Sequence, residues 1–92
     1  MEFEWDEAKA ASNYVKHGVT FARAIVVFAD PGHVDGNASL STGESRRKAV
    51  GLIEGRLMTV VYTMRGEAIR IISARRASKA ERASYDDRQI HS

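Results

Sequence analysis

The chain has 92 residues, of which 43% are hydrophobic and 28% charged, with a formal net charge of +2; this balance is typical of one folded domain rather than of a disordered chain. It contains no cysteine, which excludes a disulfide scaffold and thiolate metal sites, and no apolar run approaches the roughly 20 residues of a membrane span. The N-terminal residues are rich in acidic side chains and unlike a signal peptide. We therefore expect a single domain over residues 1–92, in the cytoplasm and without a membrane partner.

Residues 1–32 predict one short strand followed by two helices. Aromatic and acidic side chains alternate over residues 2–5, as in a strand. Asp6 can cap a helix of roughly a dozen residues that Gly18 ends, and Thr20 can cap a second helix that a Pro-Gly pair stops. Apolar residues recur at helical spacing in both helices, namely Ala8, Ala11 and Val15 in the first and Phe21, Ala24, Ile25 and Phe28 in the second.

The second half of the chain predicts strands. Residues 33–45 are interpreted as a polar loop, with or without a fragment of strand. Three runs rich in Val, Ile, Leu and Thr follow, separated by hairpin turns at Glu54-Gly55 and Arg65-Gly66. Ser78 and Glu81 have the spacing of a capping box, which opens a last helix. The three predicted strands are Arg47–Glu54, Arg56–Met64 and Glu67–Arg75.

The predicted order is therefore β-α-α-β-β-β-α, an α+β domain with helices packed on one face of an antiparallel sheet and the other face free to bind. Residues 1–43 hold three basic and six acidic residues, a net charge of −3, whereas residues 44–82 hold ten basic and four acidic residues, a net charge of +6. Most of the basic residues are arginines, which bind phosphate through two hydrogen bonds and stack on bases. The strand-rich half predicts contact with a nucleic acid or an acidic protein, unless it is simply a solvated basic surface.

Three arginines near the end of the last strand are predicted to bind phosphate. Arg70 interrupts an apolar strand, so it faces solvent, pairs with an acid such as Glu44, or points at a ligand. Because side chains alternate along a strand, Arg76 rather than Arg75 is expected to share a face with Arg70, unless a bulge intervenes. Each of the three arginines can instead be structural.

His17 is the main candidate for proton transfer, because imidazole changes charge near neutral pH. It lies at the predicted end of the first helix, where a cationic side chain can instead cap the terminal carbonyls. Glu44 is interpreted as a base or as the partner of an arginine. No zinc-type grouping of histidines is visible, so no metal or cofactor is expected. The residues expected to contact a nucleic acid are Lys9, Lys16, Arg46, Arg65 and Tyr85, although Tyr85 can instead pack on the sheet.

Two ordered blocks of the sequence resemble a known family. The first is Phe3-x-Trp5-Asp6-x-x-Lys9-x-x-x-Asn13-x-x-Lys16-His17-Gly18-Val19-x-Phe21. The second joins Gly55-Arg56-Leu57, Ile69-Arg70-Ile71-Ile72-Ser73-Ala74-Arg75-Arg76-Ala77 and Glu81-Arg82-x-x-Tyr85. Over residues 3–85 the chain resembles the BrnT-type toxins of type II toxin–antitoxin systems, and it departs from their pattern in residues 33–45.

The resemblance implies a RelE-like fold, a ribonuclease that arrests translation, and neutralisation by a BrnA-type antitoxin that binds operator DNA. By the same analogy, two toxins and two antitoxins would form a heterotetramer. We expect metal-independent cleavage in which the 2′-hydroxyl of RNA attacks the adjacent phosphate. The residues expected to assist it are His17, Glu44, Arg70, Arg75 and Arg76. One alternative is a non-catalytic nucleic-acid-binding module, which would bind RNA without cutting it. Another is a degenerate toxin that acts only as a corepressor subunit with its antitoxin.

Overall fold

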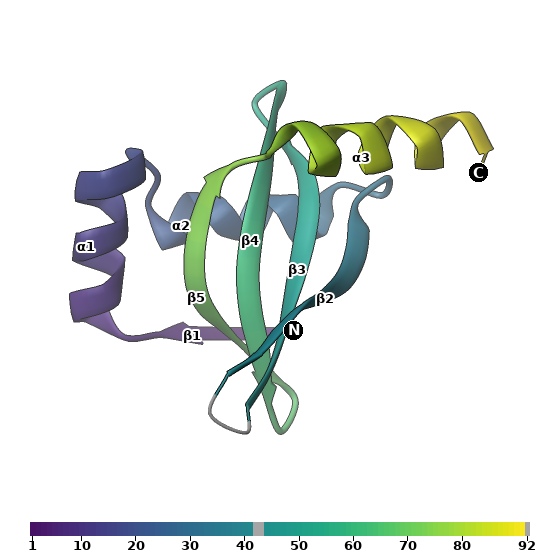
Figure 1. Cartoon of the computed structure of the whole chain (residues 1–92). Helices are drawn as coiled ribbons and strands as arrows, with labels where there is room; N and C mark the ends of the chain where they lie inside the picture. The colour runs from purple at the N-terminus through teal and green to yellow at the C-terminus, as the bar shows by residue number, and fades with distance from the viewer. Residues whose placement is uncertain (42–43, 92) are drawn as a thin grey trace.

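The computed structural model describes residues 1–41 and 44–91, which form one five-stranded sheet with helices around it (Figure 1). The strands lie in the order β1-β5-β4-β3-β2; β1 is parallel to β5, and the other neighbouring pairs are antiparallel. No helix in this described part is long and apolar enough to cross a membrane. The elements are β1 (Glu2–Trp5), α1 (Glu7–His17), α2 (Phe21–Ala24), the 3₁₀ helix η1 (Ile25–Ala29), β2 (Val34–Ser41), β3 (Glu44–Ile53), β4 (Arg56–Arg65), β5 (Ala68–Arg76) and α3 (Lys79–His91).

The α+β class is confirmed, but the predicted order lacks one strand and becomes β-α-α-β-β-β-β-α. Residues 34–41, predicted within a polar loop, form β2 and pair with β3 at the edge of the sheet. An edge strand needs no continuous apolar face, because one backbone edge stays open to water. The polar composition of residues 34–41 is therefore the reason that the sequence predicts a loop there. The second hairpin turn also lies one residue later than predicted, at Gly66 and Glu67.

The hydrophobic core lies between the sheet and the segment formed by α2 and η1. Phe21 and Val27 of this segment are fully buried and belong to one cluster with Val60 of β4 and Ile71 of β5. As predicted, Thr20 caps α2, by accepting a hydrogen bond from the backbone of the first turn. Figure 1 shows α2 behind the sheet. We call the side of the sheet that α2 and η1 cover the core face, and the opposite side the open face.

Helix α1 lies beside β5 instead of over the sheet (Figure 1). As predicted, Asp6 caps its first turn and Gly18 ends it, with a left-handed backbone conformation (φ 70°). The side of α1 that faces β5 carries Asn13, the buried residue of this helix, and the half-buried Ala10. The apolar positions Ala8, Ala11 and Val15 are exposed instead.

The Asn13 side chain binds the backbone of β5 as a neighbouring strand would. Its amide nitrogen donates to the Ala74 carbonyl (2.9 Å), and its carbonyl oxygen accepts from the Ala74 N–H (3.0 Å). Strand β1 pairs with residues 68–71 of β5, and none of the described strands lies beside the edge of β5 beyond them. Because buried backbone groups need partners, Asn13 both closes this edge and fixes the end of α1 against it.

A β-bulge interrupts β5 in its middle. Along β4 the pairing steps from Ser73 directly to Ile71, so Ile72 has no partner of its own in β4. An extra residue in one strand shifts its alternation by one, and side chains beyond it point to the opposite face from the one that an uninterrupted strand would give.

The bulge decides which way the three arginines of β5 point. Ala74 belongs to the core cluster, so Arg75 points to the open face and Arg76 to the core face. Arg70 lies between two core residues, and it also points to the open face. The expectation that Arg76 shares a face with Arg70 is therefore wrong, because Arg75 shares it instead.

Helix α3 crosses the open face at one end of the sheet, so the helices do not all cover the same face (Figure 1). Its first turn has the predicted capping box: the Ser78 N–H donates to the Glu81 carboxylate (2.8 Å), and the Glu81 N–H donates to the Ser78 hydroxyl (3.2 Å). The Glu81 carboxylate is almost fully buried. It also accepts from the Thr59 hydroxyl (2.8 Å), the Lys48 ammonium (3.0 Å) and the Arg75 guanidinium (2.7 and 2.9 Å).

The contacts between Glu81 and Arg75 shift the pKa values of both side chains. The hydrogen bonds from Arg75 contribute most to holding the pKa of the Glu81 carboxyl well below its usual range, against the opposing effect of burial. The same bonds raise the pKa of Arg75. An ionised Glu81 therefore holds α3 to three strands of the sheet.

Replacing Asn13 by alanine should lower the free energy of unfolding by about 2–4 kcal/mol, because an N–H and a carbonyl of β5 lose their buried partner. Urea denaturation monitored by circular dichroism measures the difference. The exposed neighbour Ser12 offers the control, since Ser12→Ala should change stability by less than about 0.5 kcal/mol. If Asn13→Ala were as stable as the wild type, the edge of β5 would not depend on this side chain.

Replacing Glu81 by glutamine should reduce stability at neutral pH by about 3 kcal/mol, the typical cost of breaking a buried ion pair. Because the folded pKa of Glu81 is depressed, its stabilisation is fully present above the unfolded value of about 4.3 and is lost as the pH falls through the folded value. The stabilities of the wild type and of Glu81→Gln should therefore converge in acid.

Thermal unfolding from neutral to acidic pH measures this convergence. The exposed turn residue Glu67 gives the matched control, since Glu67→Gln should follow the wild type throughout. A stability gap between Glu81→Gln and the wild type that stays constant into acid would contradict the assignment.

Candidate functional site

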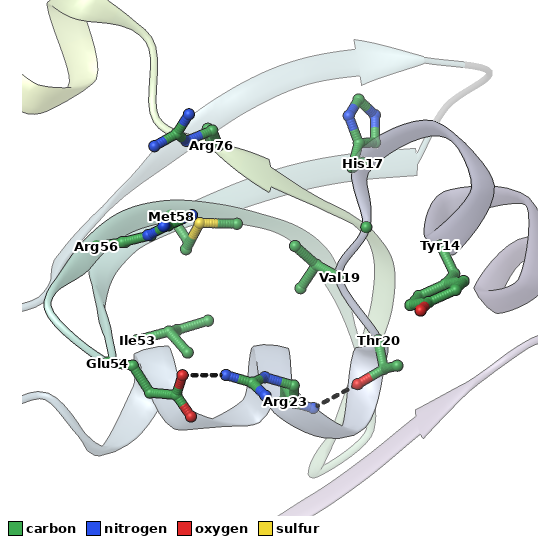
Figure 2. Close-up of a pocket in the computed structure, with 11 residues that line it drawn as sticks. Tyr14, His17, Val19, Thr20, Arg23, Ile53, Glu54, Arg56, Met58 and Arg76 are labelled. Carbon is green, nitrogen blue, oxygen red and sulfur yellow. Dashed lines mark hydrogen bonds and ion pairs between the residues drawn. The ribbon is translucent and has the colours of Figure 1, made fainter.

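A hollow of about 710 Å³ opens at the end of the sheet where β5 finishes (Figure 2). The end of α1, the start of α2, the turn between β3 and β4 and the last residue of β5 form its walls. This volume lies within the range of about 300–1,000 Å³ that is usual for ligand sites. Its polar lining consists of Tyr14, His17, Thr20, Arg23, Glu54, Arg56 and Arg76.

Arg56 and Arg76 meet at the hollow from neighbouring strands. Strand β4 begins at Arg56, directly after a tight turn in which Glu54 and Gly55 have left-handed backbone conformations (φ 49° and 79°). Strand β5 ends at Arg76, which is in register with Met58, two residues along β4. Both arginines are exposed, and neither forms an ion pair with a residue that the structure describes. Two such guanidinium groups can bind one phosphate.

A third arginine of the hollow, Arg23, is neutralised. Its guanidinium forms an ion pair with Glu54, across the hollow from Arg76 in Figure 2. The pair connects α2 to the turn that precedes Arg56. Arg23 therefore contributes to the shape of the hollow more than to its positive charge.

His17 lies at the rim of the hollow as the last residue of α1 (Figure 2). The Gly18 N–H already donates to the terminal carbonyl of Tyr14 (2.8 Å). The exposed imidazole makes no hydrogen bond with the described residues, so the helix-cap interpretation has no contact to support it. Both ring nitrogens are therefore open to a hydrogen bond with a ligand in the hollow.

Two smaller hollows continue the first one on either side. One of about 170 Å³ shares His17 with it and adds Lys9 and Lys16 of α1. The other, of about 360 Å³, shares Arg56 and Arg76 with it and adds Arg82 of α3. We call the resulting line of exposed side chains the basic track: Lys9, Lys16, His17, Arg56, Arg76 and Arg82.

No member of the basic track forms an ion pair with a side chain that the structure describes. A run of cations without carboxylate partners attracts the phosphates of a nucleic acid. Four of the residues that the sequence singled out, Lys9, Lys16, His17 and Arg76, are thus brought together by the fold.

Arg70 and Arg75 lie on the open face and are held by acids. Arg70 donates to Glu4 of β1 (3.3 Å), and Arg75 donates to Glu81 as described above. Both side chains are half-buried. The predicted group of three arginines therefore does not line one hollow, because the bulge at Ile72 separates Arg76 from the other two.

Arg46, Arg65 and Tyr85 do not line the 710 Å³ hollow, although Tyr85 lines the adjoining hollow of about 360 Å³. The side chain of Glu44 is outside the described part of the structure. Arg46 lies on the open face of β3, and Arg65 ends β4 at the opposite end from Arg56. Tyr85 is buried and donates to Asp30 (2.7 Å); burial and this hydrogen bond raise its pKa to about 12. The packing interpretation of Tyr85 is the one that these contacts support.

Sequence reasoning did not select Tyr14, Arg56 and Arg82. The position of Arg56 immediately after a predicted tight turn was a usable signal, because a strand terminus next to a turn is open to a ligand. Arg82 follows the capping box, and Tyr14 precedes His17 by one helical turn. Neither position shows in the sequence that the residue lies near the hollow, because that depends on the tertiary structure. Within the described residues, no three His, Asp or Glu side chains gather closely enough to hold a metal ion.

Comparison with protein families matches residues 5–81 to the family described as the ribonuclease toxin BrnT of type II toxin–antitoxin systems. No curated protein is similar enough to the chain to count as a match. The family match includes both helices that flank the hollow, all of β4 and β5, and every residue of the basic track except Arg82. A toxin of this class acts on RNA and has a cognate antitoxin. The chain belongs to the BrnT family and is a ribonuclease toxin of a type II toxin–antitoxin system.

Proposed function

We propose that RNA is cleaved in the hollow between α1 and the end of the sheet, by attack of a ribose 2′-hydroxyl on the adjacent phosphorus. The new bond joins the 2′-oxygen to phosphorus, and the bond between phosphorus and the 5′-oxygen breaks. The products are a 2′,3′-cyclic phosphate and a 5′-hydroxyl. The RNA supplies its own nucleophile, so the protein has to orient the phosphate, stabilise its charge and assist proton transfer.

Arg56 and Arg76 are the groups proposed to hold the phosphate. Negative charge grows on the phosphoryl oxygens as the 2′-oxygen attacks, and fixed cations stabilise that charge. These two arginines flank Met58 at the end of adjacent strands, are exposed, and have no carboxylate partner in the described part of the chain. Arg70 and Arg75 fail the same criterion, since Glu4 and Glu81 already neutralise them.

His17 is proposed to transfer a proton, either from the 2′-hydroxyl or to the departing 5′-oxygen. Its imidazole stands at the rim of the same hollow and is not used as a helix cap. Lys9, Lys16 and Arg82 would bind the flanking phosphates. The single observation that carries the proposal is this arrangement of unpaired cations around one exposed histidine.

The test compares RNA cleavage by the wild type and by Arg56→Ala, Arg76→Ala and His17→Ala in the presence of a chelator. We expect each variant to lose about 10²-fold or more in cleavage rate, the usual effect of removing a charge-stabilising or proton-transfer group. Gel analysis of an end-labelled RNA gives the rate, and the cyclic phosphate identifies the chemistry. Arg65→Ala is the matched control, because Arg65 is an exposed arginine about 30 Å along the same strand.

Full activity of both arginine variants would refute the assigned phosphate site. Cleavage of RNA in which the attacking 2′-hydroxyl is replaced by hydrogen would refute the proposed chemistry. Binding of RNA by the wild type without any cleavage would favour a non-catalytic binding module.

We also propose that a BrnA-type antitoxin covers the basic track and that the complex contains two toxins and two antitoxins. The exposed cations give an acidic segment of the antitoxin a surface on which to neutralise the toxin. Native mass spectrometry of the co-purified complex should give the mass of two copies of each chain. A stable complex of one copy of each chain, at every concentration tested, would exclude this stoichiometry.

A further inference from the structure

Tyr14 is a large aromatic side chain that the core does not use. Its side chain lines the hollow, although the residue is 56% exposed, and it lies one helical turn before His17 on the same side of α1 (Figure 2). Among the side chains and backbone groups that the structure describes, its hydroxyl has no hydrogen-bond partner. The hydrogen bonds of Asn13 and the packing of Ala10 hold α1 against the sheet, so the fold has no evident need for an aromatic ring at position 14.

The position of the ring matters because the basic track runs past it. His17 lies on the next turn of α1 and lines the same hollow, and Arg76 lies across the hollow. Proteins that bind single-stranded nucleic acids combine such cationic surfaces with exposed aromatic rings on which bases stack. The neighbouring Val15 is 85% exposed but does not line the hollow, so exposure alone does not distinguish this site.

We infer that Tyr14 is a stacking platform for one base of a single-stranded RNA whose phosphates lie on the basic track. This inference rests on the proposed function, because it takes the hollow as the place where RNA binds. The hollow has room for a base together with its sugar and phosphate, since its volume is about 710 Å³.

Stacking on Tyr14 restricts the substrate to RNA with unpaired bases. In an A-form duplex each base is stacked between its neighbours and paired, so no base face is available to a side chain. A base on Tyr14 must therefore come from a single strand, a loop or a bulge. Because every base has an aromatic face, stacking binds without reading sequence.

The test uses short single-stranded oligonucleotides with 2′-O-methyl riboses, which cannot undergo the proposed attack, and with the fluorescent base 2-aminopurine at successive positions. Fluorescence anisotropy gives the Kd, and quenching of 2-aminopurine reports stacking. We expect quenching at one position with the wild type. Tyr14→Ala should abolish that quenching and weaken binding roughly tenfold, whereas Tyr14→Phe should retain both. Alanine is the best helix former, so the exposed position in α1 should tolerate it.

Val15→Ala is the matched control and should bind and quench as the wild type does. A duplex of the same sequence should compete at least tenfold less well than the single strand. Equal quenching and equal Kd for Tyr14→Ala and the wild type would overturn the inference, and so would equal competition by the duplex.

The proposed phosphate site and the stacking role of Tyr14 can be refuted by different outcomes. If Arg56→Ala and Arg76→Ala bound the oligonucleotide and cleaved unmodified RNA as the wild type does, the phosphate site would be wrong whatever Tyr14 contributes. If they lost cleavage while Tyr14→Ala showed normal quenching, only the stacking role would be lost.

Discussion

The arrangement of the site depends on the β-bulge at Ile72. Without it, side chains would alternate evenly along β5, and Arg70 and Arg76 would point to one face. With it, Arg75 joins Arg70 on the open face, while Arg76 turns to the core face, which α2 and η1 cover. The unpaired residue Ile72 therefore places the arginines of β5 on different faces of the sheet. Those on the open face are neutralised by Glu4 and Glu81, and the one at the hollow is left without a carboxylate.

The same half of β5 also determines where α1 lies. Beyond the segment paired with β1, the edge of β5 is closed by Asn13, whose amide takes the two hydrogen bonds that another strand would make with Ala74. Because Asn13 is one turn before His17, this contact sets the imidazole beside the end of the strand. The bulge of β5 thus directs Arg76 to the hollow, and the edge of β5 positions His17 there by binding α1 through Asn13. The toxin's proposed chemistry follows from these two local features rather than from a deep cleft.

Much of the fold could be predicted from sequence because its signals are local. The caps of α1 and α2, the capping box of α3 and the tight turn before β4 each depend on residues close together in the chain. Other features depend on distant contacts. A polar edge strand resembles a loop, the exposed apolar positions of α1 resemble a buried face, and Ile72 resembles any other strand residue. For this reason the sequence points to His17, Lys9, Lys16 and Arg76, which the fold brings to the candidate site, although their roles stay predictions. The grouping of Arg76 with Arg70 and Arg75 is wrong, and the sequence patterns do not single out Arg56.

The proposed site requires that Arg56 and Arg76, and not Arg70 and Arg75, contact RNA phosphate. The most direct measurement is an NMR titration of ¹⁵N-labelled protein that follows the side-chain Nε–Hε signals of its arginines as a non-cleavable single-stranded RNA analogue is added. Assignment comes from single arginine-to-lysine variants. We expect saturable shifts of the Arg56 and Arg76 signals and unchanged signals for Arg70 and Arg75. Shifts of the Arg70 and Arg75 signals with unchanged Arg56 and Arg76 signals would contradict this expectation. They would place the RNA on the open face of the sheet.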